Sequence, residues 1–223
     1  MSFPGAELPL EARAALALQL RRANVRSVKV MRAIELAPRA LFAPHRFKDL
    51  AARDVALPIG CGQTMPSAAD LAWRLDALDI EPKHRVLEIG SGSGYATTVL
   101  SLLAGEVESV ERFQTLALGA ARRLADLGVE NARVACADGL DIPRSAGRYD
   151  RIILHVALDA VPQSLFGALA ADGLLAYGRR SKSLSGPTRA RWIKVARFND
   201  EAKETDLGPC RLPAALLGRA GVL

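Results

Sequence analysis

The chain has 223 residues and half of them are hydrophobic, so it is long enough to bury one sizeable α/β core. Lysine and arginine number 30 against 24 acidic residues, which gives a net charge of +6. A basic surface can attract nucleic acid or acidic peptides, or it can simply remain solvated. Aromatic residues make up only 5% of the chain, which argues against a groove built for stacked bases.

Three cysteines, Cys61, Cys136 and Cys210, are far apart and have neither the spacing of a metal site nor the even number of a disulfide framework. This usage is typical of a reducing compartment, so we expect a cytoplasmic protein with no bound metal. Residues 1–10 lack the basic segment and apolar core of a signal peptide. No apolar stretch reaches the length that spans a membrane, so no membrane partner is expected.

The first third of the chain is predicted to be mainly helical, because apolar residues recur at the helical period over 10–23, 25–36 and 68–78. Pro38 ends the second helix, since proline cannot continue it. Ser67 is placed to cap the third helix. Residues 56–66, with two glycines and two prolines, read as a loop. We expect residues 1–80 to form an extension. It either forms one wall of a ligand site or only packs on the core.

The rest of the chain alternates apolar strands with helices. Strands are predicted over 86–89, 107–111, 132–135, 149–155, 174–177 and 191–198, with helices over 95–103, 113–127 and 162–170. This alternation predicts right-handed crossovers and a doubly wound, mostly parallel sheet. The last strand is expected to be antiparallel after a turn at Gly186-Pro187, and the tail after Thr205 is predicted to be loop. Residues 81–223 should therefore form a Rossmann-like α/β core.

A glycine-rich turn follows the first strand of this core, with Glu88 just before Gly90, Ser91, Gly92 and Gly94. Glycine lets the backbone approach a ligand closely and adopt positive φ. The spacing is G-x-G-x-G rather than the dinucleotide fingerprint G-x-G-x-x-G. A carboxylate at Glu88 would repel a pyrophosphate but would suit a sulfonium cation. The pattern favours S-adenosylmethionine as cofactor, with an ordinary βα turn as the alternative.

Other candidate residues lie at the carboxyl ends of the next strands, where open α/β sheets bind their ligands. Glu111 ends the second strand and is placed to accept both ribose hydroxyls, with Arg112 beside it. Asp138 and Gly139 end the third strand. The Asp138 carboxylate suits the amino group of adenine, although Asp-Gly is also a common turn. Together with the glycine turn, these residues form the predicted cofactor site.

His155 ends the fourth strand on the side where a methyl acceptor would lie. It could act as a base, or it could be a core histidine with a satisfied hydrogen bond. Methyl transfer depends on alignment more than on acid–base help, and a carboxylate is already ionised at neutral pH. The sequence shows no base with an orienting partner. This favours a carboxylate acceptor, while His155 leaves a hydroxyl acceptor open.

Over residues 25–198 the chain resembles the protein-L-isoaspartate O-methyltransferase family. The resemblance rests on the Leu-Pro-Ile-Gly-Cys-Gly-Gln-Thr segment at 57–64, the glycine turn at 86–95, the segment 109–112 and the pair Asp138-Gly139. It implies a Rossmann-like fold and S-adenosylmethionine as methyl donor. It also implies methyl esterification of the abnormal carboxyl group of isoaspartyl residues in damaged protein, after which the ester collapses through a succinimide.

Three differences from the family pattern lie on the acceptor side. Where the family has a serine thought to be catalytic, this chain has Pro66, and Ser67 follows one position later. Residues 155–158 read His-Val-Ala-Leu where the family tends to have Thr-Ala-Ala-Pro, and residues 176–178 read Ala-Tyr-Gly where it tends to have Pro-Val-Gly. The resemblance and these differences make Thr64, Ser67 and His155 the candidate catalytic residues.

Three hypotheses follow from the sequence. The first is a carboxyl methyltransferase of the isoaspartyl type that acts, as a monomer or homodimer, on a protein or peptide bearing a carboxylate. The second is a homologue that binds the methyl donor but has a changed acceptor or no turnover. The third is a nucleic-acid methyltransferase, which only the net charge of +6 favours.

Overall fold

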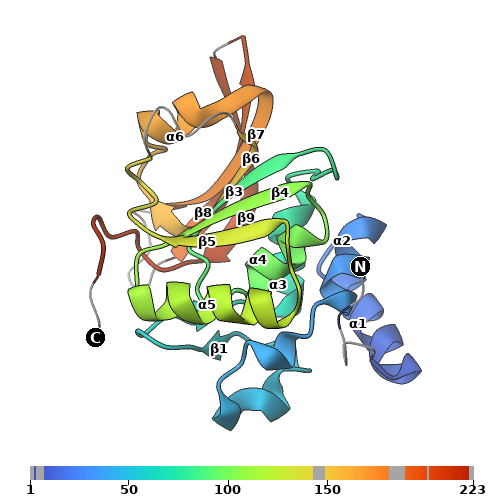
Figure 1. The fold of residues 1–223 in the computed structure, drawn as a ribbon. Coiled ribbons are helices and arrows are strands. Elements are labelled where there is room, and N and C mark those ends of the chain that lie inside the picture. The colour runs from blue at the N-terminus through green and yellow to red at the C-terminus, as the bar shows by residue number, and fades with distance from the viewer. Residues whose placement is uncertain (1–2, 4–7, 143–148, 181–188, 200, 221–223) are drawn as a thin grey trace.

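The computed structural model describes residues 3, 8–142, 149–180, 189–199 and 201–220; the turn predicted at Gly186-Pro187 lies outside them. Its centre is a seven-stranded sheet with the strand order β5-β4-β3-β6-β7-β8-β9 (Figure 1). The strands are β3 (Arg85–Ile89), β4 (Glu106–Glu111), β5 (Ala132–Cys136), β6 (Tyr149–Leu158), β7 (Leu169–Arg180), β8 (Arg189–Phe198) and β9 (Glu201–Arg211). From β5 to β7 neighbouring strands run parallel, whereas β8 and β9 are antiparallel. The predicted doubly wound sheet is therefore confirmed.

Helices cover both faces of the sheet (Figure 1). One face carries α3 (Ala68–Asp76), α4 (Tyr95–Ser101) and α5 (Gln114–Asp126), and the other carries α6 (Gln163–Ala168). Two hydrophobic clusters correspond to these two faces: Val86 belongs to the first and its neighbour Leu87 to the second. Adjacent residues of β3 are buried on opposite sides, as expected for a central parallel strand.

The first helices of the N-terminal extension pack on the first face, beside α4 and the extension's own α3 (Figure 1). The extension contains α1 (Leu10–Arg22), α2 (Val28–Leu36) and the short 3-10 helices η1 (Arg39–Leu41) and η2 (His45–Leu50). Leu20 and Ile34 belong to the same buried cluster as Leu71 of α3. The carboxylate of Asp76, at the end of α3, accepts a hydrogen bond of 2.8 Å from the backbone N–H of Ser27. The extension and the sheet thus share one hydrophobic core.

Two parts of the chain predicted to be loop contain strands. Within residues 56–66, β1 (Leu57–Pro58) pairs with β2 (Thr64–Met65) in a short hairpin. After Thr205, the chain continues as part of β9 as far as Arg211. Most of β9 is exposed, so its sequence carries no alternating hydrophobic pattern, and its edge position tolerates Pro209. In the part of the chain that the structure describes, no helix combines the length and the hydropathy needed to cross a membrane.

Candidate functional site

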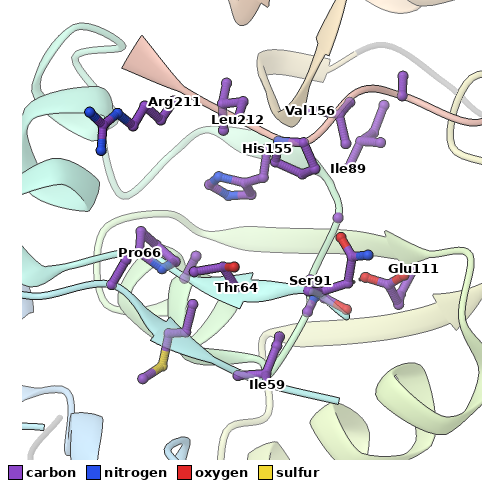
Figure 2. A pocket seen from close by; sticks show the side chains of 18 of the residues that line it. Ile59, Thr64, Pro66, Ile89, Ser91, Glu111, His155, Val156, Arg211 and Leu212 are labelled. Atoms are coloured by element: carbon purple, nitrogen blue, oxygen red, sulfur yellow. Dashed lines mark hydrogen bonds between the residues drawn. The ribbon is translucent and has the colours of Figure 1, made fainter. Parts of the chain in front are cut away.

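A cavity of about 1540 Å³ opens at the carboxyl ends of the parallel strands, beside the β1–β2 hairpin. It brings together most of the predicted site residues, and its lining includes Thr64, Ser67, Gly90, Ser91, Gly92, Glu111, Arg112, Asp138, Gly139 and His155. Figure 2 shows Ser91 and Glu111 toward one end, and Pro66, His155 and Arg211 toward the other. We call these ends the donor half and the acceptor half.

The glycine turn and the end of β4 form the donor half. Gly90 and Gly92 have φ values of 93° and 54°, which residues with a side chain rarely adopt. The backbone N–H of Gly92 donates to one oxygen of Glu111 at 2.9 Å, and the N–H of Phe113 donates to the other at 3.0 Å. A carboxylate oxygen can accept a second hydrogen bond, so the buried Glu111 keeps acceptor capacity for ligand hydroxyls.

Ser91 and Gly94 have different roles in this turn. The Ser91 hydroxyl is buried in the cavity lining and has no hydrogen-bond partner among the described residues, which fits a site that binds a polar ligand group. Gly94 does not line the cavity. Its φ is 89°, and a Cβ there would lie 3.1 Å from the Cβ of Ala120. Gly94 therefore lets α4 and α5 approach closely, and its contact with the cofactor remains a prediction.

The carboxylate of Asp138 is already engaged by a segment that follows β9. One oxygen accepts a hydrogen bond of 2.9 Å from the N–H of Leu140, and the other accepts one of 2.6 Å from the N–H of Gly218. The guanidinium of Arg112 donates to the Gly218 carbonyl at 3.0 Å. Two predicted cofactor residues thus hold the C-terminal segment, which the sequence reasoning missed.

This segment, residues 213–220, runs beside the cavity, which its first four residues line, and we call it the C-terminal strap. At one end the N–H of Ala157 donates to the carbonyl of Pro213 at 2.7 Å, and the N–H of Ala215 donates to the carbonyl of Ala157 at 2.9 Å. At the other end the N–H of Ala220 donates to the carbonyl of Arg112 at 3.0 Å. The strap therefore connects the end of β6 with the end of β4.

Glu88 is not among the residues that line the cavity, and its role toward a sulfonium remains a prediction. Its side chain is fully buried between β3, α4 and β4. One oxygen accepts hydrogen bonds from the hydroxyls of Thr97 at 2.5 Å and Ser109 at 2.6 Å. The other oxygen lies 3.0 Å from Nε2 of His155. Glu88 thus acts on the cavity only through His155.

His155 therefore has the orienting partner that the sequence did not reveal. Its ring lines the acceptor half, and its Nδ1 atom is buried with no hydrogen-bond partner among the described residues. Glu88 and His155 lie 67 positions apart in sequence. Only the pairing of β3 with β6, which sets Glu88 opposite Ile153, brings them together.

The hairpin carries the remaining predicted acceptor residues. Thr64 is exposed on β2, across the cavity from His155 (Figure 2). The Ser67 hydroxyl accepts a hydrogen bond of 3.2 Å from the N–H of Asp70, which confirms its predicted role as the cap of α3. The buried Arg39 donates to the carbonyl of Pro66 at 2.9 Å and so fixes the end of the hairpin. Catalytic roles for Thr64, Ser67 and His155 remain predictions.

Charged groups also surround the acceptor half. The buried Arg74 donates through Nε to Asp70 at 3.1 Å, and through Nη2 to the backbone carbonyl of Arg211 at 3.2 Å. Burial raises the pKa of Asp70, and the nearby Arg74 opposes this shift. The Arg211 side chain is exposed at the cavity, with no ion pair or hydrogen bond to any described residue. The i, i+4 spacing of Asp70 and Arg74 could have indicated their pairing in the sequence.

Metal binding has no support in the described parts of the chain, where no group of three or more His, Cys, Asp or Glu side chains could hold an ion. Cys61, Cys136 and Cys210 are all free thiols.

Comparison with known proteins agrees with this geometry. Residues 11–178 match the family described as protein-L-isoaspartate(D-aspartate) O-methyltransferase. A protein-L-isoaspartate O-methyltransferase of Rhodopseudomonas palustris (strain BisA53) is 45% identical over 158 residues, covering 71% of this chain and 74% of the relative. The protein-L-isoaspartate O-methyltransferase 2 of strain HaA2 is 40% identical over 203 residues, covering 91% and 92%.

Solved structures give the same result. A protein-L-isoaspartate O-methyltransferase superposes with a TM-score of 0.79 at 25% identity, covering 92% of this chain and 67% of that chain. A second, from Plasmodium falciparum, described as a putative protein-L-isoaspartate O-methyltransferase in complex with S-adenosyl-L-homocysteine, has a TM-score of 0.78 at 17% identity and covers 91% and 97%. The chain belongs to the protein-L-isoaspartate(D-aspartate) O-methyltransferase family.

Proposed function

We propose that the protein is an S-adenosylmethionine-dependent methyltransferase that esterifies the abnormal carboxyl group of isoaspartyl residues in proteins and peptides. Membership of the family supports this reaction. The observation that carries it is the single cavity in which Ser91 and Glu111 line one half and His155 lines the other. A donor and an acceptor can therefore meet in one site.

The donor half fits an adenosine-containing ligand. Glu111 offers oriented carboxylate oxygens for ribose hydroxyls, and Ser91 offers an unpaired hydroxyl. Gly90 and Gly92 leave space for the ligand beside the backbone. Asp138, Gly139 and Arg112 lie at the same end, under the C-terminal strap. S-adenosylmethionine, when bound, supplies an electrophilic methyl group on its sulfonium.

The acceptor half fits a carboxylate, which needs orientation rather than deprotonation. The hydroxyls of Thr64 and Ser67 can donate hydrogen bonds to carboxylate oxygens. The hydroxyl of Ser67 accepts from Asp70 but keeps its own proton free to donate. Pro66, fixed by Arg39, offers neither a hydroxyl nor an N–H. Thr64 and Ser67 on the hairpin side of the cavity, and His155 on the opposite side, thus act as positioning groups for the carboxylate.

A transfer assay with a labelled methyl donor tests the proposal. The expected product is a base-labile methyl ester on an isoaspartyl peptide and none on the same peptide with normal aspartate. No ester above background on any isoaspartyl peptide would overturn the assigned acceptor. Normal donor affinity without transfer to proteins, peptides or metabolites would instead favour the donor-binding homologue without turnover.

A nucleic-acid substrate has less support. Two neighbouring basic residues are neutralised in ion pairs, since Arg179 pairs with Glu204 and Arg180 with Asp159. Salt-dependent RNA binding would reopen this alternative, because binding through phosphates weakens steeply as salt rises. The free thiols of all three cysteines support a cytoplasmic setting, which we infer for the protein.

A further inference from the structure

We propose that His155, oriented by Glu88, recognises the acceptor carboxylate as an imidazolium, so that substrate binding takes up a proton. This inference rests on the proposed function and names the group that replaces the hydroxyl missing at Pro66. It also makes Glu88 a positioning residue for the acceptor rather than a contact of the methyl donor.

The environment of Glu88 fixes the orientation of the ring. Two hydroxyls, from Thr97 and Ser109, donate to one carboxylate oxygen, which leaves the other for His155. A carboxylate is only an acceptor, so the Nε2 atom 3.0 Å away has to carry hydrogen.

The Nδ1 atom of His155 is therefore the one that meets the substrate. It is buried in the cavity lining and has no partner among the described residues. In the neutral ring it presents a lone pair, which repels a carboxylate oxygen. In the imidazolium it presents an N–H, which donates a charge-assisted hydrogen bond to that oxygen. A bound carboxylate thus favours the protonated ring.

The other charged or titratable groups around the acceptor half are paired, protonated or exposed, so we assign recognition of the carboxylate to His155. The titratable and charged groups that face this half from the other elements are Asp54, Asp70, Arg74, Arg191, Cys210 and Arg211, and Arg191 pairs with Asp206. Asp70 and Arg74 neutralise each other in an ion pair, and burial keeps the Cys210 thiol protonated by raising its pKa to about 11. Arg211 is exposed at the mouth. A substrate carboxylate beside the buried Glu88 therefore adds a negative charge that the imidazolium balances.

Pro66 explains why such a group is needed. It lies on the hairpin side of the cavity, and His155 lies on the opposite side (Figure 2). The family resemblance places a hydroxyl at Pro66, and proline has neither a hydroxyl nor an N–H. In this chain the end of β6 thus supplies a hydrogen-bond donor opposite the hydroxyls of Thr64 and Ser67.

Calorimetry on the full-length protein tests the proposal. An isoaspartyl peptide is titrated into the protein saturated with S-adenosylhomocysteine, in two buffers of different ionisation enthalpy. At pH 7.5 we expect net proton uptake on peptide binding, because the bound carboxylate favours the protonated ring. The KM for the peptide should rise as pH increases above neutrality, while kcat at saturating peptide changes less.

His155→Gln should abolish the proton uptake and weaken peptide binding about 10-fold to 100-fold, since a hydrogen bond to a charged partner is lost. Affinity for S-adenosylhomocysteine should stay unchanged, which separates this loss from misfolding. The matched control is His45→Gln, because His45 is exposed on η2 and does not line the cavity. This control should keep both the proton uptake and the peptide affinity.

Two results would overturn the proposal. One is peptide binding without proton uptake in the wild type, or with the same uptake in His155→Gln. The other is methylation of hydroxyl-bearing peptides that depends on His155, which would make the residue a base. If the wild type neither binds nor methylates any isoaspartyl peptide, the proposed function itself has failed, and the wild-type assay shows this before any variant is compared.

Discussion

The carboxylate of Glu111 accepts a 2.9 Å hydrogen bond from the backbone N–H of Gly92, which ties the end of β4 to the glycine turn after β3. Its second oxygen is held by the N–H of Phe113. Both oxygens are therefore oriented before any ligand binds, and this preorganisation reduces the cost of binding.

Replacing Glu111 with Gln should weaken binding of S-adenosylhomocysteine by about 1–3 kcal/mol. Glutamine has one acceptor oxygen and an NH₂ group that cannot accept, so either Gly92 or Phe113 loses its partner and the ribose hydroxyls lose a charged acceptor. Titration calorimetry measures the change, with the exposed Glu130→Gln as a control that should bind normally. Unchanged affinity in Glu111→Gln would refute the ribose assignment.

Gly94→Ala should destabilise the protein by about 1–3 kcal/mol, because φ is positive there and the new Cβ would lie 3.1 Å from the Cβ of Ala120. Gly167→Ala is the matched control: it lies in α6, and a Cβ there meets no atom within 4 Å. This control should be neutral or slightly stabilising. Thermal unfolding separates the two variants, and equal melting temperatures would contradict the packing role of Gly94.

Pro66→Ser should raise kcat/KM for an isoaspartyl peptide about 10-fold, since one hydrogen bond to a carboxylate is worth about 1.5–3 kcal/mol. The Pro66 carbonyl that accepts from Arg39 is retained in this variant. Pro58→Ser, an exposed change on the same hairpin outside the cavity lining, should give no gain. A loss of activity in Pro66→Ser would argue that the acceptor half has been rebuilt for another substrate.

Stability should fall in alkaline solution through Cys210. Burial raises the pKa of this thiol from 9.0 to about 11, so the folded protein holds the proton more tightly than the unfolded chain does. Its contribution is complete below pH 9 and is lost as pH rises to about 11, by about 2–3 kcal/mol. Denaturant unfolding at several pH values measures this slope. The loss of stability between pH 9 and about 11 should be smaller by about 2–3 kcal/mol in Cys210→Ala, and equal losses in the two proteins would rule the effect out.

Ending the chain after Ala215 should speed the dissociation of S-adenosylhomocysteine about 10-fold. This truncation removes the bonds that Gly218 and Ala220 make with Asp138 and Arg112, each worth about 0.5–1.5 kcal/mol. Stopped-flow displacement measures the rate. Leu217→Ala, which alters an exposed side chain and leaves the strap backbone in place, is the control. Equal rates in all three proteins would show that the strap does not retain the ligand.

The sequence predicted the regular part of this structure well. The glycine turn, Glu111 and Asp138 were recognisable because each follows an apolar strand, and strand ends in a parallel sheet meet at one edge. β9 was missed because an exposed edge strand shows no hydrophobic alternation. Hydrophobic periodicity in a sequence reflects the burial of side chains. It therefore gives no signal for a strand that is held mainly by backbone hydrogen bonds to its neighbour.

The partners of Glu88 were missed for a different reason. Its position at the end of β3 was predicted correctly, but the direction of its side chain depends on Thr97, Ser109 and His155, which come from three other elements. Strand order has to be known before such a contact can be inferred. The contact of the strap with Asp138 spans 80 positions and involves a backbone N–H, which leaves no signature in residue type.

The strap meets Asp138 and Arg112 through its own backbone, while the side chains of Leu216 and Leu217 are exposed. Substitutions at these two positions therefore leave its bonds intact. An insertion or deletion between Ala215 and Gly218 would shift the N–H of Gly218 away from the Asp138 carboxylate. The spacing of this segment, rather than the identity of its side chains, is the property that a functional chain has to keep.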